Sequence, residues 1–167
     1  MKNTNTRNRT RTKKLVMAGV LIAMSAVLAN VKIFETVAFD SMPAFLAGII
    51  LGPLAGGIVG FLGHFFTSVT SGFPLTVPIS MIISVEMLIT VYIFGKIYKK
   101  TKITAIIVGI LLNGPISVYI IAVVQKVIWG MPIYPFFMTM VLPVTLGAAA
   151  NIILACIVER GVKNVNI

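Results

Sequence analysis

The chain has 167 residues, of which 58% are hydrophobic and only 11% are charged, and its formal net charge at pH 7 is +10. Because roughly a quarter of the residues in a soluble globular domain are charged, this composition predicts an integral membrane protein. It excludes a separate soluble catalytic domain, since each membrane-crossing helix takes about 20 residues.

The basic residues gather at the ends of apolar runs. Six precede the first run, four lie in one short segment and two lie near the C-terminus: Lys2, Arg7, Arg9, Arg11, Lys13 and Lys14; Lys96, Lys99, Lys100 and Lys102; Arg160 and Lys163. The positive-inside rule places all three groups in the cytoplasm. We therefore predict a basic cytoplasmic tail over residues 1–14, disordered in its first dozen residues, a single membrane domain over 15–160, and a second cytoplasmic tail over 161–167.

Apolar runs with at most one charge predict the membrane-spanning helices. Four runs are clear, at residues 15–31, 77–94, 103–124 and 136–158. A cleaved signal peptide fits the first run poorly, since this run is long for the apolar part of a signal peptide and no clear cleavage site follows it.

Residues 38–72 hold the less certain part of the topology. Their single charge is Asp40, and Gly52-Pro53 breaks the run, because a residue before proline avoids the helical conformation. With cytoplasmic charges on both sides, this stretch crosses the membrane an even number of times. Two short helices joined at residues 51–54 give an all-α bundle of six transmembrane helices with both termini in the cytoplasm. A re-entrant hairpin satisfies the same parity.

Three predicted outer segments, residues 34–43, 70–78 and 129–135, are rich in aromatic residues and proline and nearly free of basic charge. Trp129 and Tyr134 suit two roles, since both anchoring at the lipid headgroups and contact with a ligand require an apolar ring with a polar tip. Both interpretations remain open at this stage.

Polar residues within the predicted spans are costly in hydrocarbon and normally face a cavity or a partner. Glu86 lies midway along its span, and three roles are open for it: a structural pair with His64, a place in a ligand cavity, or a proton relay. Asn151 suits either a hydrogen bond to a neighbouring helix or a ligand contact. The remaining residues of this kind are Thr67, Asn113, Tyr119 and Gln125.

The first span carries small residues four positions apart, Gly19 with Ala23 and Ser25 with Ala29, together with Ala18 and Ala26. Such residues let another helix approach closely, and that helix belongs either to this chain or to a partner.

Four segments of the chain, together with its six predicted helices and basic start, resemble one family. The segments read FDSMPAFLAG at 39–48, LGPLAG at 51–56, GHFFTS at 63–68 and GFPLTVP at 72–78. They resemble the substrate-binding S component of an energy-coupling-factor (ECF) vitamin transporter, and the last two are most similar to S components for α-ribazole, a cobalamin precursor.

The resemblance implies that the chain lies in a bacterial plasma membrane and captures a vitamin-like molecule from outside. A transmembrane T subunit and two ATPases would then drive its release into the cell. The T subunit is expected to dock on Gly19, Ala23 and Ala26, where Gly19 replaces an alanine typical of the family. The chain contains no G-x-x-x-x-G-K-[ST] phosphate loop, so it is expected not to be an enzyme that hydrolyses ATP.

The residues expected to contact the substrate suit a flat ring joined to a neutral sugar. Aromatic side chains would stack on the ring, and polar side chains would bind the ribose hydroxyls. The complete predicted set is Asp40, His64, Thr67, Phe73, Thr76, Glu86, Asn113, Tyr119, Gln125, Trp129 and Tyr134.

Riboflavin satisfies the same set of side chains and is the main alternative within the family. Phosphorylated substrates are disfavoured, because the outer half offers only Lys32 and Lys126 to hold an anion. A proton-coupled carrier, or a small membrane-embedded enzyme that uses Glu86 and His64, is the alternative from another class. No cofactor or metal is indicated.

Overall fold

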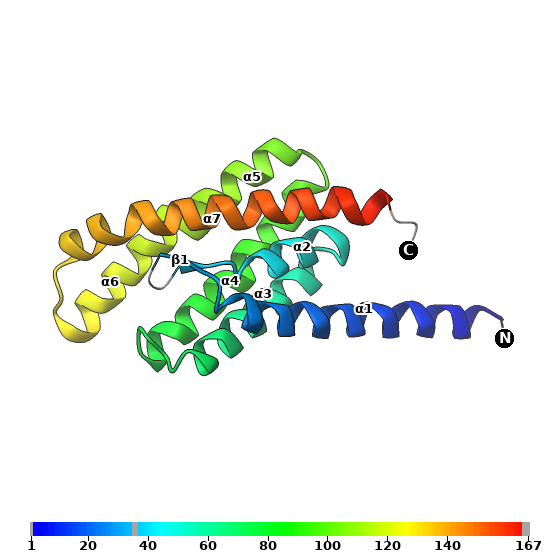
Figure 1. Cartoon of the computed structure of the whole chain (residues 1–167), viewed down its shortest axis with the longest axis horizontal. Helices are drawn as coiled ribbons and strands as arrows, with labels where there is room; N and C mark the ends of the chain where they lie inside the picture. The colour runs from blue at the N-terminus through cyan, green and yellow to red at the C-terminus, as the bar shows by residue number, and fades with distance from the viewer. Residues whose placement is uncertain (1, 35–36, 165–167) are drawn as a thin grey trace.

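The computed structural model describes residues 2–34 and 37–164, and the side chains of residues 8–31 and 38–162. Its helices lie side by side, and the start of α1 and the end of α7 project from the same end of the bundle (Figure 1). Glu35 in the first predicted outer segment, and residues 165–167 of the predicted C-terminal tail, lie outside the described residues. The elements are α1 (Lys2–Leu28), β1 (Lys32–Phe34), β2 (Val37–Ala38), α2 (Met42–Ile50), α3 (Pro53–Thr70), α4 (Val77–Tyr98), α5 (Lys102–Leu111), η1 (Leu112–Ile116), α6 (Ser117–Trp129) and α7 (Ile133–Asn164).

The prediction of a helical membrane protein is confirmed, and the described residues add one short antiparallel hairpin, β1–β2. Four helical stretches are long and apolar enough to cross a membrane: Pro53–Thr70, Val77–Tyr98, Lys102–Trp129 and Ile133–Val162. The predicted junction of two helices at Gly52-Pro53 is also confirmed. At nine residues, however, α2 is only about 14 Å long, less than half the hydrocarbon core. The count of six crossings therefore remains a prediction.

Two boundaries differ from the sequence-based predictions. The segment expected to be disordered continues α1 back to Lys2, and residues 2–14 contain neither glycine nor proline to end a helix. At the other end, α7 runs past residue 158 to Asn164. Glu159 is therefore buried in the bundle, where it accepts a hydrogen bond from the Tyr98 hydroxyl at 3.1 Å and lies 3.8 Å from the Lys102 ammonium.

Glycines bring α2, α3 and α4 into close contact. A Cβ atom added at Gly56 would overlap the Gly48 backbone, and one added at Gly95 would lie 3.0 Å from the Gly48 carbonyl oxygen. The fully buried rings of Phe45 and Phe94 meet edge to face beside these glycines, with centroids 5.0 Å apart. Backbone-to-backbone contact of this kind is how helices associate in a lipid environment, where water supplies no driving force between them.

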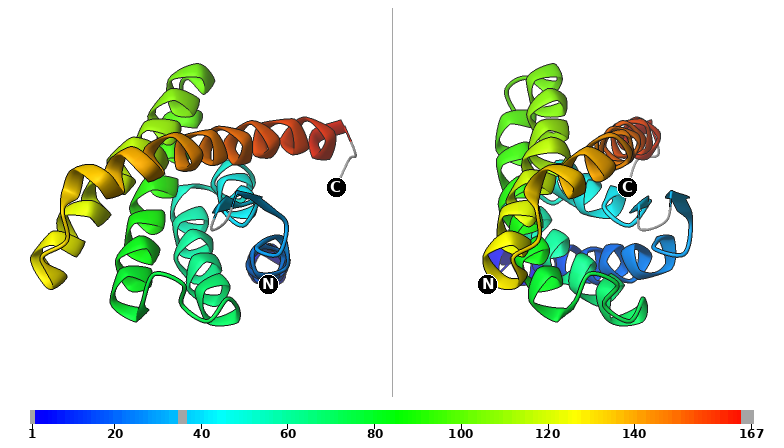
Figure 2. Two further views of the ribbon diagram at one scale, coloured as in Figure 1. Left: turned by 60° about the vertical axis from the view of Figure 1, so that its left-hand side comes forward. Right: turned by 90° about the vertical axis from the view of Figure 1, so that its left-hand side faces the viewer.

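The three-helix core separates α1 from α6. In the left view of Figure 2, α4 and α3 lie between α6 and α1, while α7 runs across the view above them. The β1–β2 hairpin and the following turn reach α7, since Asn151 on α7 binds the backbone of Ala38 and Met42. This connection encloses the space in which the candidate site lies.

Candidate functional site

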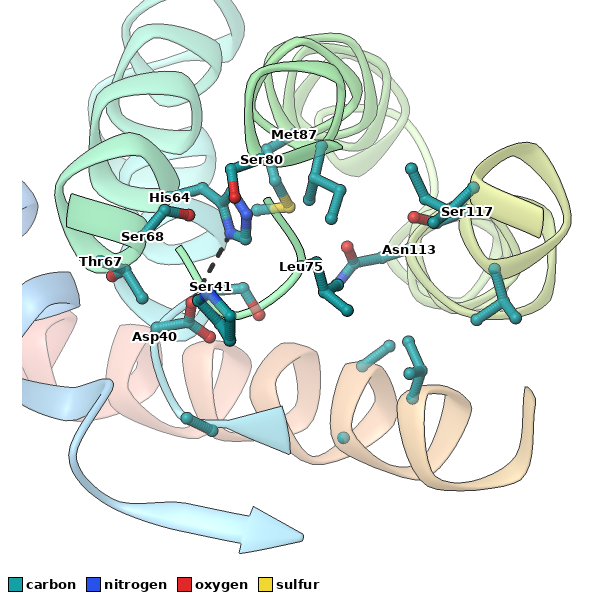
Figure 3. Close-up of a pocket in the computed structure, with 18 of the residues that line it drawn as sticks. Asp40, Ser41, His64, Thr67, Ser68, Leu75, Ser80, Met87, Asn113 and Ser117 are labelled. Carbon is teal, nitrogen blue, oxygen red and sulfur yellow. Dashed lines mark ion pairs between the residues drawn. The ribbon is translucent and has the colours of Figure 1, made fainter. Parts of the chain in front are cut away.

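A cavity of about 230 Å³ opens among the β2–α2 turn, α3, the α3–α4 turn, α4, η1, α6 and α7 (Figure 3). Ligand pockets commonly range from about 300 to 1,000 Å³, so this cavity suits a small ligand. Most of its polar side chains come from the β2–α2 turn, α3 and η1. Most of its apolar side chains come from α4, α6 and α7, which also supply Ser80, Ser117 and Asn151. Its lining residues are Ala29, Ala38, Asp40, Ser41, His64, Thr67, Ser68, Ser71, Pro74, Leu75, Ser80, Ile83, Met87, Asn113, Ser117, Val118, Ile121, Phe136, Met140, Val144, Gly147, Ala148 and Asn151.

The first polar wall joins the β2–α2 turn to α3. The Nδ1 atom of His64 lies 3.8 Å from the Oδ2 atom of Asp40, and these side chains are 21% and 18% exposed (Figure 3). One helical turn further along α3, the Thr67 hydroxyl donates a hydrogen bond of 3.3 Å to the backbone carbonyl of Ser25 on α1. A carboxylate, an imidazole and two hydroxyls, those of Thr67 and Ser68, therefore border this side of the cavity.

The second polar group comes from an irregular turn of helix. Residues 112–116 form a π-helical turn, in which Pro115 has no backbone N–H and Gly114 has non-helical dihedral angles (φ −106°, ψ −107°). A Cβ atom at Gly114 would lie 2.9 Å from the Thr145 hydroxyl, so glycine allows α7 to approach here. Asn113 and Ser117 flank this turn and both line the cavity. Such π-helical turns are frequent at functional sites.

Glu86 on α4 is hydrogen-bonded to the cavity residue Ser117. The Ser117 hydroxyl donates a hydrogen bond of 2.6 Å to the Oε2 atom of Glu86, a length typical of a hydroxyl bound to a carboxylate. The Oε1 atom of Glu86 is buried and has no hydrogen-bond partner among the described residues. Glu86 itself does not line the cavity. A pair with His64 was one of three roles left open for it; among the described contacts, Glu86 instead binds Ser117, and His64 lies beside Asp40.

The apolar wall lies on α4, α6 and α7. Phe136 and Met140 are four residues apart on α7 and so share one helix face. Met87 from α4 lines the same cavity (Figure 3). The other apolar side chains of this wall are Ile83, Val118, Ile121 and Val144. A lining that combines these polar groups with an apolar surface of ring size suits a ligand that joins a flat apolar part to a polar part.

Asn151 links α7 to β2 and to the start of α2 by hydrogen bonds. Its Oδ1 accepts a hydrogen bond of 2.8 Å from the Met42 backbone N–H, and its Nδ2 donates to the carbonyls of Ala38 and Gly147 at 2.9 Å each. The side chain is 2% exposed. The predicted role of Asn151 as a hydrogen-bond link to a neighbouring element is confirmed.

The rim of the cavity between α3 and α4 is strained. Phe73 and Thr76 adopt positive φ angles of 53° and 85°, next to Gly72 at 71°. A β-branched residue such as threonine is rarely found there, because its side chain crowds the backbone. Strain of this kind collects at functional sites. Pro74 and Leu75, between the two strained residues, line the cavity.

The structure brings together four of the predicted substrate-binding residues, Asp40, His64, Thr67 and Asn113. The others lie elsewhere. Trp129 and Tyr134 are 45% and 70% exposed at the α6–α7 turn, and Tyr119 packs edge to face on Phe137 with centroids 6.2 Å apart. Gln125 is buried beside a separate groove between α6 and α7, and Phe73 and Thr76 belong to the rim turn without lining the cavity.

Several cavity residues were missed by sequence reasoning, above all Ser117, Phe136 and Met140. A usable signal was present, because Ser117 follows Asn113 by four residues, and a helix places such residues on one face. For Phe136 and Met140 the same spacing is indistinguishable from ordinary helix packing. The aromatic residues expected to stack on the ring, Phe73, Trp129 and Tyr134, lie in the outer loops, whereas the apolar part of the cavity lies between the helices.

The small-residue face of α1 divides in two. Ser25 and Ala29 are buried, and the Ser25 hydroxyl lies 2.8 Å from the position of a Cβ atom at Gly63, so this side packs against α3. Gly19 and Ala23 are exposed, and no atom lies within 4 Å of a Cβ atom placed at Gly19. Ala26 is half-buried between the two sides.

Residues 13–159 match the family described as "ECF transporter, substrate-specific component". Searches of curated proteins and of solved structures found no match. The matched region runs from the basic part of α1 to Glu159 on α7, and so contains the whole cavity. The chain therefore belongs to the substrate-specific components of ECF transporters, a family of transporter subunits.

Proposed function

We propose that this chain is the S component that captures α-ribazole at the outer face of the bacterial plasma membrane. Family membership makes it a transporter subunit rather than an enzyme. The observation that supports the substrate is the cavity itself: its lining combines polar side chains with an apolar surface, and no lysine or arginine is among the described residues that line it.

The apolar and the polar parts of the cavity lining suit the ring and the sugar of α-ribazole, respectively. Its dimethylbenzimidazole is flat and apolar, and would lie against Phe136, Met140 and Met87. Its ribose is neutral and carries hydroxyls, which Asp40, His64 and Asn113 can bind. Asp40, His64 and Asn113 were expected to bind the ribose, whereas Phe136, Met140 and Met87 replace Phe73, Trp129 and Tyr134 as the proposed ring contacts.

Charge argues against a phosphorylated substrate. A phosphate group in a membrane-embedded cavity requires converging arginine or lysine side chains, or a helix N-terminus. Lys126 is exposed on α6 and lies outside the cavity lining, while the side chain of Lys32 is outside the described residues. The lining instead holds a carboxylate, Asp40, which would repel an anion.

Size separates α-ribazole from riboflavin, the alternative substrate within the family. Both molecules join a flat ring to a neutral chain of hydroxyls, but riboflavin has three fused rings and α-ribazole has two. A cavity of about 230 Å³ favours the smaller molecule.

The proposed orientation places both termini in the cytoplasm. The start of α1, the turn between α4 and α5 and the end of α7 carry the basic clusters, and all three lie at one end of the bundle (Figure 1). The positive-inside rule assigns that end to the cytoplasm. The turns after α3 and α6 lie toward the opposite end, and the α3–α4 turn borders the cavity.

The exposed side of α1 is the proposed docking surface for the T subunit, which would act with two ATPases. Gly19 and Ala23 leave a shallow, open strip between exposed apolar side chains such as Val20 and Val27. A second helix can approach such a strip closely. Ala26 extends the strip by one turn and is partly covered by the chain itself.

Isothermal titration of the detergent-purified chain tests the substrate. We expect one-to-one binding of α-ribazole and much weaker binding of riboflavin. Preferential binding of riboflavin would replace the proposed substrate and keep the transporter role, and binding of neither compound would contradict both substrates.

Docking has its own test. Gly19→Leu should leave α-ribazole binding unchanged and prevent co-purification with the T subunit and ATPases, since leucine fills the open strip. The matched control is Gly161→Leu, which also enters open space but on α7. Normal assembly of the Gly19→Leu variant would contradict the assignment of this surface. Uptake by the chain alone in proteoliposomes, driven by a proton gradient, would instead support a stand-alone carrier.

A further inference from the structure

Glu86 is buried midway along α4, does not line the cavity, and yet holds a residue that does. We propose that Glu86 is a positioning residue: it fixes the Ser117 hydroxyl as a hydrogen-bond acceptor, so that the cavity selects a ligand that donates a hydroxyl group at this place. The inference rests on the proposed function and specifies how the same site recognises its substrate.

The bond to Glu86 determines what the Ser117 hydroxyl can offer to a ligand. A serine hydroxyl has one proton to donate and lone pairs that accept. The proton of Ser117 is donated to Oε2 of Glu86 at 2.6 Å, and Glu86 does not line the cavity. The Ser117 oxygen therefore offers only lone pairs to a ligand, and a ligand atom that is itself an acceptor would be repelled there.

Thr67 and Asp40, on the other side of the cavity, are also hydrogen-bond acceptors. Thr67, which lines the cavity, donates its proton to the Ser25 carbonyl, so its oxygen has only lone pairs left for a ligand. Asp40 presents a carboxylate, which accepts hydrogen bonds and donates none when ionised. Three fixed acceptors thus border the cavity, and a ligand with several hydroxyls satisfies them, whereas an anion does not.

A purely structural role for Glu86 is the alternative, since the bond to Ser117 also ties α4 to α6. Hydrogen bonds between transmembrane helices commonly contribute little to stability, and a neutral pair could supply one without a costly carboxylate. The Oε1 atom of Glu86, buried without a hydrogen-bond partner among the described residues, adds to that cost. The cost of burying this carboxylate is explained if the site needs it to accept the proton of Ser117.

The test compares two ligands that share a ring. α-Ribazole carries the ribose hydroxyls, while 1,5,6-trimethylbenzimidazole has a methyl group in place of the ribose and no hydrogen-bond donor. In Glu86→Gln the amide can donate to Ser117 and turn the serine proton into the cavity. In Ser117→Ala the acceptor is absent. We expect both variants to bind α-ribazole about 3- to 10-fold more weakly and the trimethyl compound as the wild type does.

Ser84→Ala is the matched control. Ser84 is also buried on α4, but its hydroxyl bonds to the carbonyl of Ser80 on its own helix, and it does not line the cavity. Both ligands should bind this variant with wild-type affinity. If Glu86→Gln does not fold, Ser117→Ala gives the same comparison.

Each result has one meaning. Equal weakening of both ligands, or no weakening of either, would overturn the positioning role and leave the proposed substrate intact. Equal affinity of the wild-type chain for both compounds would also overturn the positioning role and leave the proposed substrate intact. A wild-type chain that does not bind α-ribazole would overturn the proposed substrate, and with it this inference.

Discussion

The α2–α3–α4 core and the half formed by η1, α6 and α7 are built in opposite ways. In the core, glycines let backbones touch, and side chains such as Phe45, Val59 and Phe94 are fully buried. In the other half, a π-helical turn interrupts the helix and large side chains surround an open cavity.

The contrast shows how one small chain combines a fixed frame with a binding site. Close packing leaves the core with a single arrangement, because a backbone contact cannot be remade by a change of rotamer. In the half formed by η1, α6 and α7 the helix is interrupted, and Asn113, Ser117 and Phe136 line an open cavity. Breaking the core should therefore abolish folding, whereas changes around the cavity should mainly alter binding.

The largest effect is expected for Gly56→Ala. Alanine favours a helix more than glycine by about 1 kcal/mol, but here its Cβ atom would overlap the Gly48 backbone, which has no side chain to move aside. We expect a loss of about 3 kcal/mol or more in the free energy of unfolding, measured by thermal unfolding in detergent.

Gly19→Ala is the control, because nothing lies within 4 Å of its new Cβ atom. Its unfolding temperature should match or slightly exceed that of the wild type. A Gly56→Ala variant as stable as Gly19→Ala would show that α2 and α3 are not in contact at this point.

Asn151→Ala should break the connection between the two halves. The substitution leaves the Met42 N–H and the Ala38 carbonyl without their partner in a buried place, at a cost of about 2–4 kcal/mol. Thermal unfolding again measures the loss, with Asn30→Ala as the control, since Asn30 is exposed and bonds only to its own helix. Equal stability of these two variants would argue against the link.

Apolar runs and breaks in the sequence were sufficient to predict the helices. The junction at Gly52-Pro53 and the turn after Tyr98 lie where proline, glycine and charge interrupt the hydrophobic pattern. The extension of α1 to Lys2 was missed, because composition alone does not distinguish an exposed basic helix from a disordered tail.

The cavity residues were harder to predict, because a cavity depends on which helix faces meet. His64, Thr67 and Asn113 were singled out as polar residues within predicted spans, and Asp40 as a residue of the first outer segment. Phe136 gave no such signal, since an aromatic residue in an apolar helix is the expected pattern. Glu86 was recognised as unusual, but its bond to Ser117 depends on the approach of α4 to α6.

Phe136→Ala tests whether the ring contact has moved from the loops to α7. If Phe136 stacks on the benzimidazole, the substitution should weaken α-ribazole binding by about 1–3 kcal/mol in a titration. Phe137→Ala is the matched control, because the neighbouring ring packs on Tyr119 and does not line the cavity. A loss in Trp129→Ala with none in Phe136→Ala would return the ring contact to the α6–α7 turn.

The smallest expected effect is a gain in stability from Thr76→Gly at the cavity rim. Threonine at a φ of 85° is strained, and glycine adopts this conformation freely, so the variant should be more stable by about 1 kcal/mol. Thr70→Gly, at the end of α3, should lose about the same amount, because glycine in a helix is unfavourable. Opposite signs in thermal unfolding would place the strain at the rim rather than in threonine side chains in general. Since Thr76 does not line the cavity, α-ribazole affinity should be unchanged, and a weakened affinity would indicate that this strain is needed to hold Pro74 and Leu75 against the ligand.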